Sequence, residues 1–547
     1  MTAFCDLAAE NSEDITPQNT RFWVLPAQTA NSNFAIENKP YHSQMEKSHK
    51  NKMISWRRIH RWIGIPGVVF LFIFCISGII LNHRETFASI DVSRTLLPGS
   101  YALKKYNNGS ARGTTRLGRD SILLFGNTGI WLTDSSLSRF ADFNRGIDKG
   151  VDNRNIRNIV KTNDGKVWCA TQFKLYRLAE TGTWVNVELP GNDERLSDLT
   201  LTPDSTSVVA LTRSAVYVPD GDSFRRVIPE APEGYIRRVS LFKTVWKLHS
   251  GELFGTPGKL FVDFIALAII ILSFTGLAIF IIPISIRHSA GGEIAGKTAR
   301  LKKHLMWHNS IGLYTILFTL LIGGTGMCLR PPVMIPLAIT GTAPLPGSAL
   351  DSDNPWHDKL QAIRYDDATG SWLIATTDGF ILSNTDFSGK PRKISKDKAP
   401  PLSPMGVNVF CRDADGDWLV GSFSGLYKWN PATGIVTDYF TGKTTSSDGG
   451  RPTGQHLVNG YSSDLSTGPV VFDYSLGAPE LPPMPEELAA MPMSLWNVAL
   501  ELHVGRCYAP VLGPFSALFV FLSGLFLITA LLSGLILERR QHRHKNP

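Results

Sequence analysis

The stretch that opens the first long apolar run reads Trp56-Arg57-Arg58-Ile59-His60-Arg61-Trp62-Ile63-Gly64. Its histidine and its Ile-Gly pair return at the same spacing in His308-Asn309-Ser310-Ile311-Gly312, which opens another apolar run. A hydroxyl residue followed by glycine comes later in each run, as Ser77-Gly78 and as Thr325-Gly326, again at the same spacing. Repeats in one order and at one offset indicate a duplicated unit, so both halves are predicted to share one architecture.

Four apolar runs are long enough to cross a bilayer, whose core of ~30 Å requires ~20 helical residues. They begin at Ile63, Leu260, Ile311 and Val511. With their flanks, they predict transmembrane helices over residues 53–85, 248–286, 304–330 and 501–538. The remaining segments are a disordered N-terminal tail (1–52), two long β-rich loops (86–247 and 331–500), a connector (287–303) and a C-terminal tail (539–547).

Basic residues gather before the first run, in the connector after the second and in the C-terminal tail. The positive-inside rule therefore predicts that both termini and the connector are cytoplasmic. The two long loops then lie in the periplasm, and the chain is expected to be a multi-pass protein of a bacterial inner membrane. This placement accounts for the net charge of +8 without nucleic acid as a partner and makes membrane lipid the surroundings of the spans.

The composition excludes several classes of protein. The chain has 547 residues, a mean hydropathy of −0.01 and only 19% charged residues, which is typical of a mixture of membrane and water-exposed parts. Its six cysteines form no C-x-x-C pair, so the sequence offers no disulfide scaffold, zinc ribbon or covalent haem site.

The long loops are predicted to be β structure. Short apolar runs follow D-G or T-G turns and recur roughly every 35–45 residues, which is the spacing of propeller blades. Both copies start on the same side of the membrane, so they should be related by an approximate two-fold axis along the membrane normal. The predicted fold is an α+β membrane protein with four helices from two parallel repeats and one propeller-like extracytoplasmic domain of about six blades. A pair of β sandwiches is the alternative.

Four histidines are related in pairs by the repeat. His60 and His308 precede the first and third spans, whereas His249 and His503 stand in the Leu-His-x-Gly motifs that precede the second and fourth. A parallel two-fold axis would bring the two members of each pair to equal depth, where two imidazoles can ligate the iron of a b-type haem. The sequence therefore predicts two haem b groups. An interfacial, hydrogen-bonded side chain is the other reading for a histidine at a helix end.

Other ionisable residues compete for roles in the same regions. His83 lies at the far end of the first span and competes with His249 or His503 as a ligand. His288 and His304 are similar rivals on the cytoplasmic side. Asp263 is the one carboxylate inside an apolar run, which suggests a proton acceptor, a quinone contact or an interfacial residue.

The glycines at matched positions admit two readings. Small residues at these sites make room for a porphyrin face, or they let two helices approach closely. The residues concerned are Gly64, Gly78, Gly312 and Gly326.

The motifs resemble the PepSY-associated transmembrane protein family, whose members include iron-regulated inner-membrane proteins and ferric-siderophore reductases. The resemblance rests on W-R-R-I-H-R-W-I-G at 56–64, L-H-S-G-E-L-F-G at 248–255 and L-H-V-G-R at 502–506. It implies haem-bearing spans with His60, His249, His308 and His503 as ligands. It also implies that Arg506 is a cationic partner for haem propionates, although the first copy has Glu252 at that position. The long loops do not look like PepSY domains.

These observations favour a membrane haem oxidoreductase that moves electrons to a ferric chelate or siderophore in the periplasm, as in iron acquisition. No G-x-G-x-x-G follows a strand on the cytoplasmic side, so a quinol or a cytoplasmic donor must supply the electrons. The alternative function is a membrane-anchored sensor or binding protein without redox activity. A transporter is a third reading, with little support because the spans hold one carboxylate.

Overall fold

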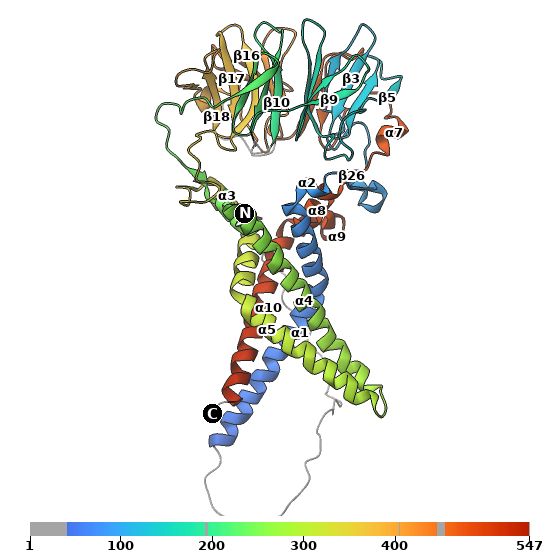
Figure 1. Ribbon diagram of the computed structural model, residues 1–547, viewed down its shortest axis with the longest axis vertical. Helices are drawn as coiled ribbons and strands as arrows, with labels where there is room; N and C mark the ends of the chain where they lie inside the picture. Colours follow the sequence, from blue (N-terminus) through green and yellow to red (C-terminus); the bar gives the residue numbers. More distant parts are fainter. Residues whose placement is uncertain (1–40, 192–194, 404, 446–453, 546–547) are drawn as a thin grey trace, which may run out of the picture. The chain divides into compact units, whose positions relative to one another are not determined.

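The computed structural model describes residues 41–191, 195–403, 405–445 and 454–545 (Figure 1). The predicted disordered tail therefore lies outside the described residues as far as residue 40. Helix α1 (Tyr41–Asn82) begins before the predicted start at residue 53. Residues 41–52 contain no glycine or proline and are rich in good helix formers, so they extend the helix where the sequence analysis expected disorder.

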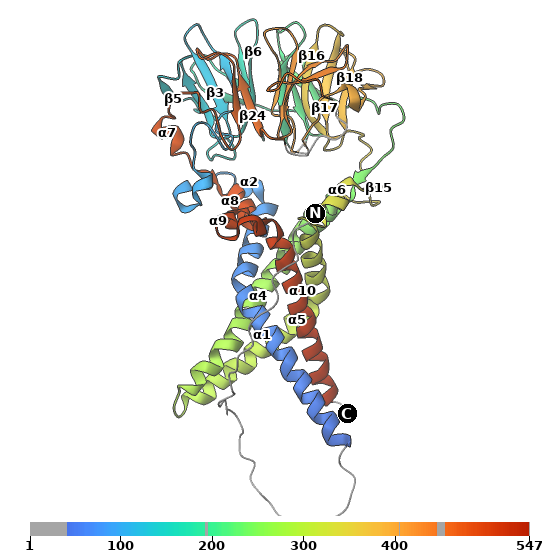
Figure 2. The same cartoon turned by 180° about the vertical axis from the view of Figure 1, so that it is seen from behind.

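Four segments are long and apolar enough to cross a membrane, which confirms the predicted number of spans. They are Ile54–Asn82, Glu252–Arg287, Glu293–Cys328 and Arg506–Arg539. Besides α1, their main helices are α4 (Gly255–Arg287), α5 (Glu293–Cys328) and α10 (Phe519–Lys545). Figures 1 and 2 view these helices from opposite sides, and in both α4 and α5 run side by side and cross α1 and α10 to form a bundle. Cys75 of α1 packs there against Ile265 and Ile269 of α4.

Two predicted boundaries differ from the structure. Helix α5 begins at Glu293, so most of the connector predicted over 287–303 is helical, because its alanine, lysine and leucine residues favour a helix. The fourth span begins with short pieces, because Pro510, Gly513 and Pro514 interrupt helical hydrogen bonding before α10. The pieces are η5 (Arg506–Tyr508), α9 (Ala509–Leu512) and η6 (Gly513–Leu518).

A short helix with the same construction precedes the second and the fourth spans. Helix α3 (Leu241–Ser250) is capped by the hydroxyl of Ser240, and α8 (Leu495–His503) by that of Ser494. The glycine of each Leu-His-x-Gly motif follows the helix in the left-handed region, with φ of +78° at Gly251 and +81° at Gly505. This conformation ends the helix and turns the chain into the span, which explains the glycine of the motif.

In the described residues the two long loops form antiparallel sheets, five with four strands each and three with two. The first loop contains β2 (Gly113–Arg116), β3 (Ile122–Gly126), β4 (Gly129–Thr133) and β5 (Phe140–Asp142), then β6 (Ile156–Lys161), β7 (Val167–Thr171), β8 (Leu175–Leu178) and β9 (Trp184–Val187), then β10 (Leu196–Leu201), β11 (Val208–Thr212), β12 (Val216–Asp220) and β13 (Ser223–Val227). The second contains β16 (Leu360–Asp366), β17 (Ser371–Thr376), β18 (Gly379–Ser383) and β19 (Arg392–Lys393), then β20 (Val409–Arg412), β21 (Trp418–Ser422), β22 (Gly425–Asn430) and β23 (Ile435–Asp438), then β24 (Val458–Ser462) and β25 (Val470–Asp473).

The first strands of these sheets contact one another in a closed order. Strand β2 contacts β6, β6 contacts β10, β10 contacts β16, β16 contacts β20, β20 contacts β24, and β24 returns to β2. At the last junction, the backbone N–H of Tyr461 donates to the carbonyl of Arg112 at 3.0 Å. The two loops therefore form one body, called the β domain below. Its tryptophans pack inside, with Trp168, Trp372 and Trp418 all buried.

The segments that lead into and out of the β domain pair with one another. Strand β1 (Asp91–Val92), at the start of the first loop, pairs with β26 (Met493–Ser494), at the end of the second. Strand β14 (Val239–Ser240) pairs in the same way with β15 (Gly341–Thr342). Because Ser240 and Ser494 end these strands and cap α3 and α8, each pairing fixes the start of a histidine-bearing helix. The remaining short helices are α2 (Arg84–Phe87), η1 (Arg94–Leu96), η2 (Gly99–Tyr101), η3 (Glu252–Phe254), α6 (Met334–Ile339), η4 (Lys396–Lys398) and α7 (Glu486–Ala489).

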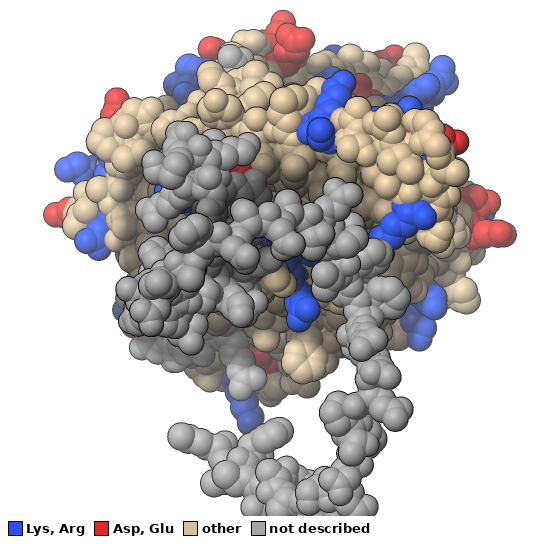
Figure 3. All heavy atoms as spheres, turned by 90° about the horizontal axis from the view of Figure 1, so that it is seen from below, with Lys and Arg blue, Asp and Glu red and all other residues tan. Residues whose placement is uncertain are grey.

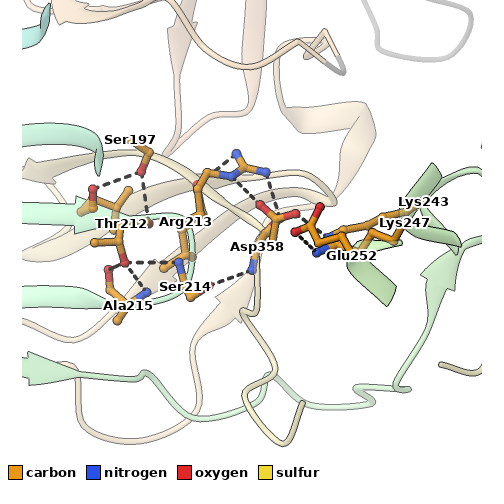
Figure 4. Close-up of polar contacts among 11 residues, drawn as sticks. Ser197, Thr212, Arg213, Ser214, Ala215, Lys243, Lys247, Glu252 and Asp358 are labelled. Atoms are coloured by element: carbon orange, nitrogen blue, oxygen red, sulfur yellow. Dashed lines mark hydrogen bonds and ion pairs between the residues drawn. The ribbon is translucent and has the colours of Figure 1, made fainter. Parts of the chain in front are cut away.

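Ion pairs join the β domain to the short helices. Arg84 of α2 pairs with the buried Asp152 at 2.6 Å and lies over the ring of Trp496. Asp358 pairs both with Lys243 of α3 at 2.7 Å and with Arg213 of the β domain at 3.0 Å (Figure 4). Burial alone would raise the pKa of the Asp358 carboxyl, but the charges of Lys243 and Arg213 outweigh burial and lower it to about 2.

Charged side chains of both signs are interspersed round the edge of the view along the helices (Figure 3). Blue and red atoms alternate there with tan ones, so the excess of basic residues is not gathered into one patch on the visible rim.

We expect Asp358→Asn to weaken the junction between the β domain and α3 by on the order of 1 kcal/mol, because the pair is partly exposed. Asparagine is a suitable replacement because it tolerates the positive φ of +55° at this position. The folded-state pKa is depressed, so the stabilisation is complete above the unfolded pKa of about 3.9 and is lost as the pH falls toward 2.

The measurement is the melting temperature of the purified protein from pH 6 to pH 2, compared with that of the variant. The difference between the two proteins should stay constant above about pH 5 and vanish near pH 2. Asp378→Asn is the matched control, because Asp378 forms an exposed pair with Lys359 and should show a smaller difference. A pH-independent difference for Asp358→Asn would contradict the prediction.

Candidate functional site

The structure brings together the histidines that the repeat relates. His60 of α1 and His308 of α5 have ring centroids 6.2 Å apart, with an angle of 80° between the ring planes. His249 of α3 and His503 of α8 have centroids 6.1 Å apart at 56°. The chain thus has two imidazole pairs with nearly the same separation.

The two pairs lie at different levels of the bundle. The hydroxyl of Ser77 contacts His503, and Ser77 and His60 belong to the same helix, α1. Residues 60 and 77 are ~25 Å apart along a helix that rises ~1.5 Å per residue. The same interval separates His308 from Thr325, which contacts His249. The pairs are therefore separated by most of the ~30 Å thickness of a bilayer core.

Each histidine is held through Nδ1 by a hydroxyl group on a helix from the other repeat. The contacts lie between 2.9 and 3.3 Å, and two of the rings also contact a backbone carbonyl at 2.9 to 3.0 Å. The partners are Ser533 and the Ala530 carbonyl for His60, Thr275 for His308, Thr325 and the Ile322 carbonyl for His249, and Ser77 for His503.

The protonation of these rings follows from their partners. A carbonyl oxygen only accepts, so Nδ1 of His60 and Nδ1 of His249 must carry the proton. The hydroxyl of Thr275 already donates to the carbonyls of Ile271 and Leu272, so it accepts from His308. Ser77 donates to its own helix in the same way and accepts from His503. In all four rings the Nε2 lone pair is then left available, and in the described residues it has no hydrogen-bond partner.

A glycine lies under each histidine ring, directly after the hydroxyl residue. A Cβ atom at Gly326 would stand 2.7 Å from Cε1 of His249, and one at Gly78 would stand 3.5 Å from Cε1 of His503. At Gly276 and Gly534, it would stand 3.2 Å from Cε1 of His308 and of His60. Gly326, Gly276 and Gly534 therefore make room for the histidine rings, whereas a side chain at Gly78 would be in ordinary van der Waals contact with His503.

Two of the predicted glycines have no such role. A Cβ atom at Gly64 would meet nothing within 4 Å, and one at Gly312 would meet only Leu272 at 3.7 Å. The sequence analysis missed Thr275-Gly276 and Ser533-Gly534 in the second and fourth spans. The signal was present, because every span contains a hydroxyl–glycine pair of this kind. The fourth span contains a second one, Ser523-Gly524, so the significance of each pair depends on which helix faces each histidine.

The rival residues lie outside both pairs. Nε2 of His83 contacts Oδ2 of Asp263 at 2.6 Å, and Nδ2 of Asn82 donates to Oδ1 of the same carboxylate at 3.0 Å. His83 is thus a partner of Asp263 and not of His249 or His503. Neither His288 nor His304 has a ring contact with another histidine among the described residues.

Arg506 forms an ion pair with the carboxylate of Glu501. Its Nε donates to Glu501 at 2.8 Å, and Glu501 also accepts from the hydroxyl of Tyr101 at 2.6 Å. Glu252, at the corresponding position of the first copy, pairs instead with Lys247 at 2.8 Å. Nε of Arg330 is buried without a hydrogen-bond partner. Each Leu-His-x-Gly motif therefore has one cation–carboxylate pair beside it, but the residue after the glycine is acidic in the first copy and basic in the second.

The described residues contain no group of three or more His, Cys, Asp or Glu side chains that could hold a metal ion. Any iron at the histidines would have only two protein ligands, one from each ring. A planar macrocycle supplies the other four ligands in bis-histidine haem proteins.

Comparisons with known proteins give a family and a set of distant structural matches. The family described as "PepSY-associated TM region" matches residues 37–282 and again 286–541. No curated protein matches the chain.

Two of the matching solved structures are extracellular domains of hybrid two-component systems of B. thetaiotaomicron. The BT4673 domain has 9% identity and a TM-score of 0.34, and the match covers 72% of this chain and 38% of that one. The BT3049 domain has 9% identity and a TM-score of 0.30, with 71% and 36% covered. The chain therefore spans less than two fifths of either structure.

The hydrogen bonds predict one tautomer for the four paired histidines. Solid-state ¹⁵N spectra of histidine-labelled protein, prepared without added cofactor at neutral pH, should show their Nδ1 protonated and their Nε2 unprotonated. Thr275→Val removes the acceptor of His308 and should alter the signals of that ring alone. His288→Gln is the control, since it should remove one signal and leave the others unchanged. Protonated Nε2 in the paired rings would contradict the assignment.

Proposed function

We propose that this chain, which belongs to the family defined by the PepSY-associated TM region, is an inner-membrane haem-b protein that reduces ferric chelates, siderophores among them, on the periplasmic side. One observation carries the proposal: two pairs of imidazoles face each other at two levels, each ring anchored through Nδ1 with its Nε2 available. This is the donor set that two bis-histidine haem groups require.

The ring separations fit a shared iron. A metal–nitrogen bond of about 2.0 Å, with the ring centroid about 1.2 Å behind the nitrogen, places two ligand rings on one line about 6.4 Å apart. The centroids of the two pairs are 6.2 and 6.1 Å apart. An edge contact between two rings can have a similar length. The anchored Nδ1 atoms favour ligation over such a contact, because they leave the metal-binding nitrogen free in every ring.

The hydroxyl and carbonyl partners would act as a second shell. A hydrogen bond from Nδ1–H fixes the tautomer and the ring orientation, and it makes Nε2 more basic. Since each partner belongs to a helix of the other repeat, the packing of the two halves sets the position of all four ligands. The glycine under each ring allows that close packing.

Bound haem would supply a one-electron couple at each level of the bundle. The chain's own contribution is to hold the two sites ~25 Å apart along the helices, near opposite faces of the bilayer, and to keep water from them. The basic flanks of the first span, the connector and the tail favour the orientation with the β domain in the periplasm. Electrons would then leave from the His249–His503 level.

The donor would be a membrane quinol or a cytoplasmic protein. A quinol releases two electrons and two protons, whereas each ferric ion takes one electron, so the chain must also dispose of protons if a quinol is used. His83 and Asp263 are 2.6 Å apart and partly exposed, at 34% and 16% of their side-chain surface. A carboxylate–imidazole pair at the edge of a span is suited to accept such protons.

The β domain is inferred to be a six-bladed propeller with one incomplete blade. The closed order of contacts between the first strands of its sheets supports this inference. Its attachment to α3 and α8, the helices that carry His249 and His503, supports a role in presenting substrate to that level. A sensor without redox activity is the competing function, and it requires no cofactor.

The first experiment is the absorption spectrum of the purified full-length chain in detergent. We expect a b-type Soret band that dithionite reduces and that a ferric chelate reoxidises. A colourless protein after expression with ample haem supply would contradict the proposal and favour the sensor.

Substitution of single histidines tests the pairing. We expect His60→Ala or His308→Ala to remove one of two haem groups, and His249→Ala or His503→Ala to remove the other, because one ligand does not retain the iron. The measurement is haem per chain by the pyridine haemochrome spectrum. His83→Ala is the matched control and should retain both groups. Unchanged haem content in all four variants would refute the ligand assignment.

Two glycines form a matched pair for testing the fit of the rings. Gly326→Ala adds a methyl group 2.7 Å from His249 and should displace that ring, lowering the haem content of one site by about half or more. Gly64→Ala adds the same group in open space and should leave both sites intact. Equal haem spectra for the two variants would show that the ring does not need this space.

A further inference from the structure

A small polar cavity lies where the β domain meets α8. It encloses about 180 Å³, which is smaller than the ~300–1,000 Å³ pockets that hold drug-sized ligands. Its lining includes Arg94, Tyr101, Arg112, Tyr474, Asn497 and Glu501. Asn497 and Glu501 belong to α8 and precede His503 by two turns or less. The cavity therefore lies close to the His249–His503 pair along α8.

Two guanidinium groups in this cavity are not neutralised. Arg94 donates to the carbonyls of Met491 at 3.0 Å and Tyr101 at 2.7 Å. Arg112 donates to the side chain of Asn155 and the carbonyl of Ile156, and its Nε is buried with no partner. Among the described residues, neither arginine forms an ion pair with a carboxylate. Burial of a charge without a counter-ion costs free energy. The cavity therefore favours an anion as the partner of these two arginines.

The one carboxylate of the lining is already satisfied. Glu501 accepts from Tyr101 and pairs with Arg506, so the charges of Glu501 and Arg506 cancel. The lining therefore keeps the two positive charges of Arg94 and Arg112.

A third arginine, Arg157, lies close to Arg112. Nε of Arg157 is also buried without a partner. Burial lowers the pKa of Arg157, and the nearby charges of Arg112 and Arg84 lower it further. Burial lowers the pKa of Arg94 and Arg112 to about 10, so both still carry their charge at neutral pH.

We propose that this cavity binds a small ferric chelate with several carboxylate groups, a ferric hydroxycarboxylate of the citrate type. This proposal rests on the proposed function and names its substrate class. Guanidinium groups bind carboxylates through paired N–H donors, and the amide of Asn497 and the hydroxyl of Tyr474 can hydrogen-bond the remaining oxygens. The size of the cavity excludes bulky siderophores from it, and its charge disfavours uncharged chelates.

The test uses the full-length protein in detergent and gallium(III) citrate, which has the charge and shape of the ferric complex but accepts no electron. Isothermal titration calorimetry should show saturable binding that weakens as salt is added. We expect Arg94→Gln and Arg112→Gln each to weaken binding at least tenfold. Arg116→Gln is the matched control, because Arg116 lies on β2 near Arg112, pairs with Asp464 and should bind as the wild type does.

A second variant guards against misfolding. Asn497→Phe keeps both arginines but fills the cavity, and it should abolish binding while the melting temperature and haem spectrum stay unchanged. Undiminished binding of gallium citrate by Asn497→Phe and by both arginine variants would overturn the proposal. Failure of the wild-type protein to bind gallium citrate would overturn it as well. Tighter binding of iron-free citrate, or equal competition by an uncharged gallium trihydroxamate, would overturn the substrate class.

Haem content separates this proposal from its rivals. If Arg112→Gln lowers haem per chain, the arginines serve the propionates of a haem group, and the proposal is overturned. If the wild type holds no haem but binds gallium citrate in an arginine-dependent way, the proposed function fails while the carboxylate site stands. Retained haem together with arginine-dependent binding supports both.

Discussion

The rest of the structure depends on one requirement, that each imidazole inside the bundle has its Nδ1–H satisfied by the other half of the chain. Water is scarce at this depth, and an unpaired polar group there costs free energy, so the acceptors must come from neighbouring helices. Ser77 and Thr325 serve one pair of rings, and Thr275 and Ser533 serve the other. The four contacts join each repeat to the other and hold the rings in two close pairs.

The two long loops extend the same symmetry. Each loop begins and ends in a short strand, and each strand pairs with one from the other loop, β1 with β26 and β14 with β15. The short strand at the end of each loop, β14 or β26, finishes in the serine that caps a histidine-bearing helix. A glycine in the left-handed region ends that helix. The position of His249 and of His503 is thus fixed from both sides, by a cap and by a turn.

Function is expected to lie in the departures from this symmetry. Asp263 has Ala517 as its counterpart in the second copy, and Glu252 has Arg506. The His83–Asp263 pair therefore has no counterpart at Ala517, and the cavity beside α8 lies in the copy that carries Arg506. The proposed electron path would need such one-sided features, because protons and an anionic chelate would have to be handled at defined places.

By itself the sequence determined the four spans, the duplication and the identity of the paired histidines, because hydropathy and repeated motifs are local and survive in the linear order. It did not reveal which helix faces each ring, so Gly64 and Gly312 were chosen where Gly276 and Gly534 contact the histidines. Only the tertiary structure decided that His83 binds Asp263 and that Arg94 and Arg112 share a cavity, because these contacts join residues far apart in the chain. Their physical basis is the packing of helices and sheets, which brings unsatisfied polar groups together in ways that no local spacing encodes.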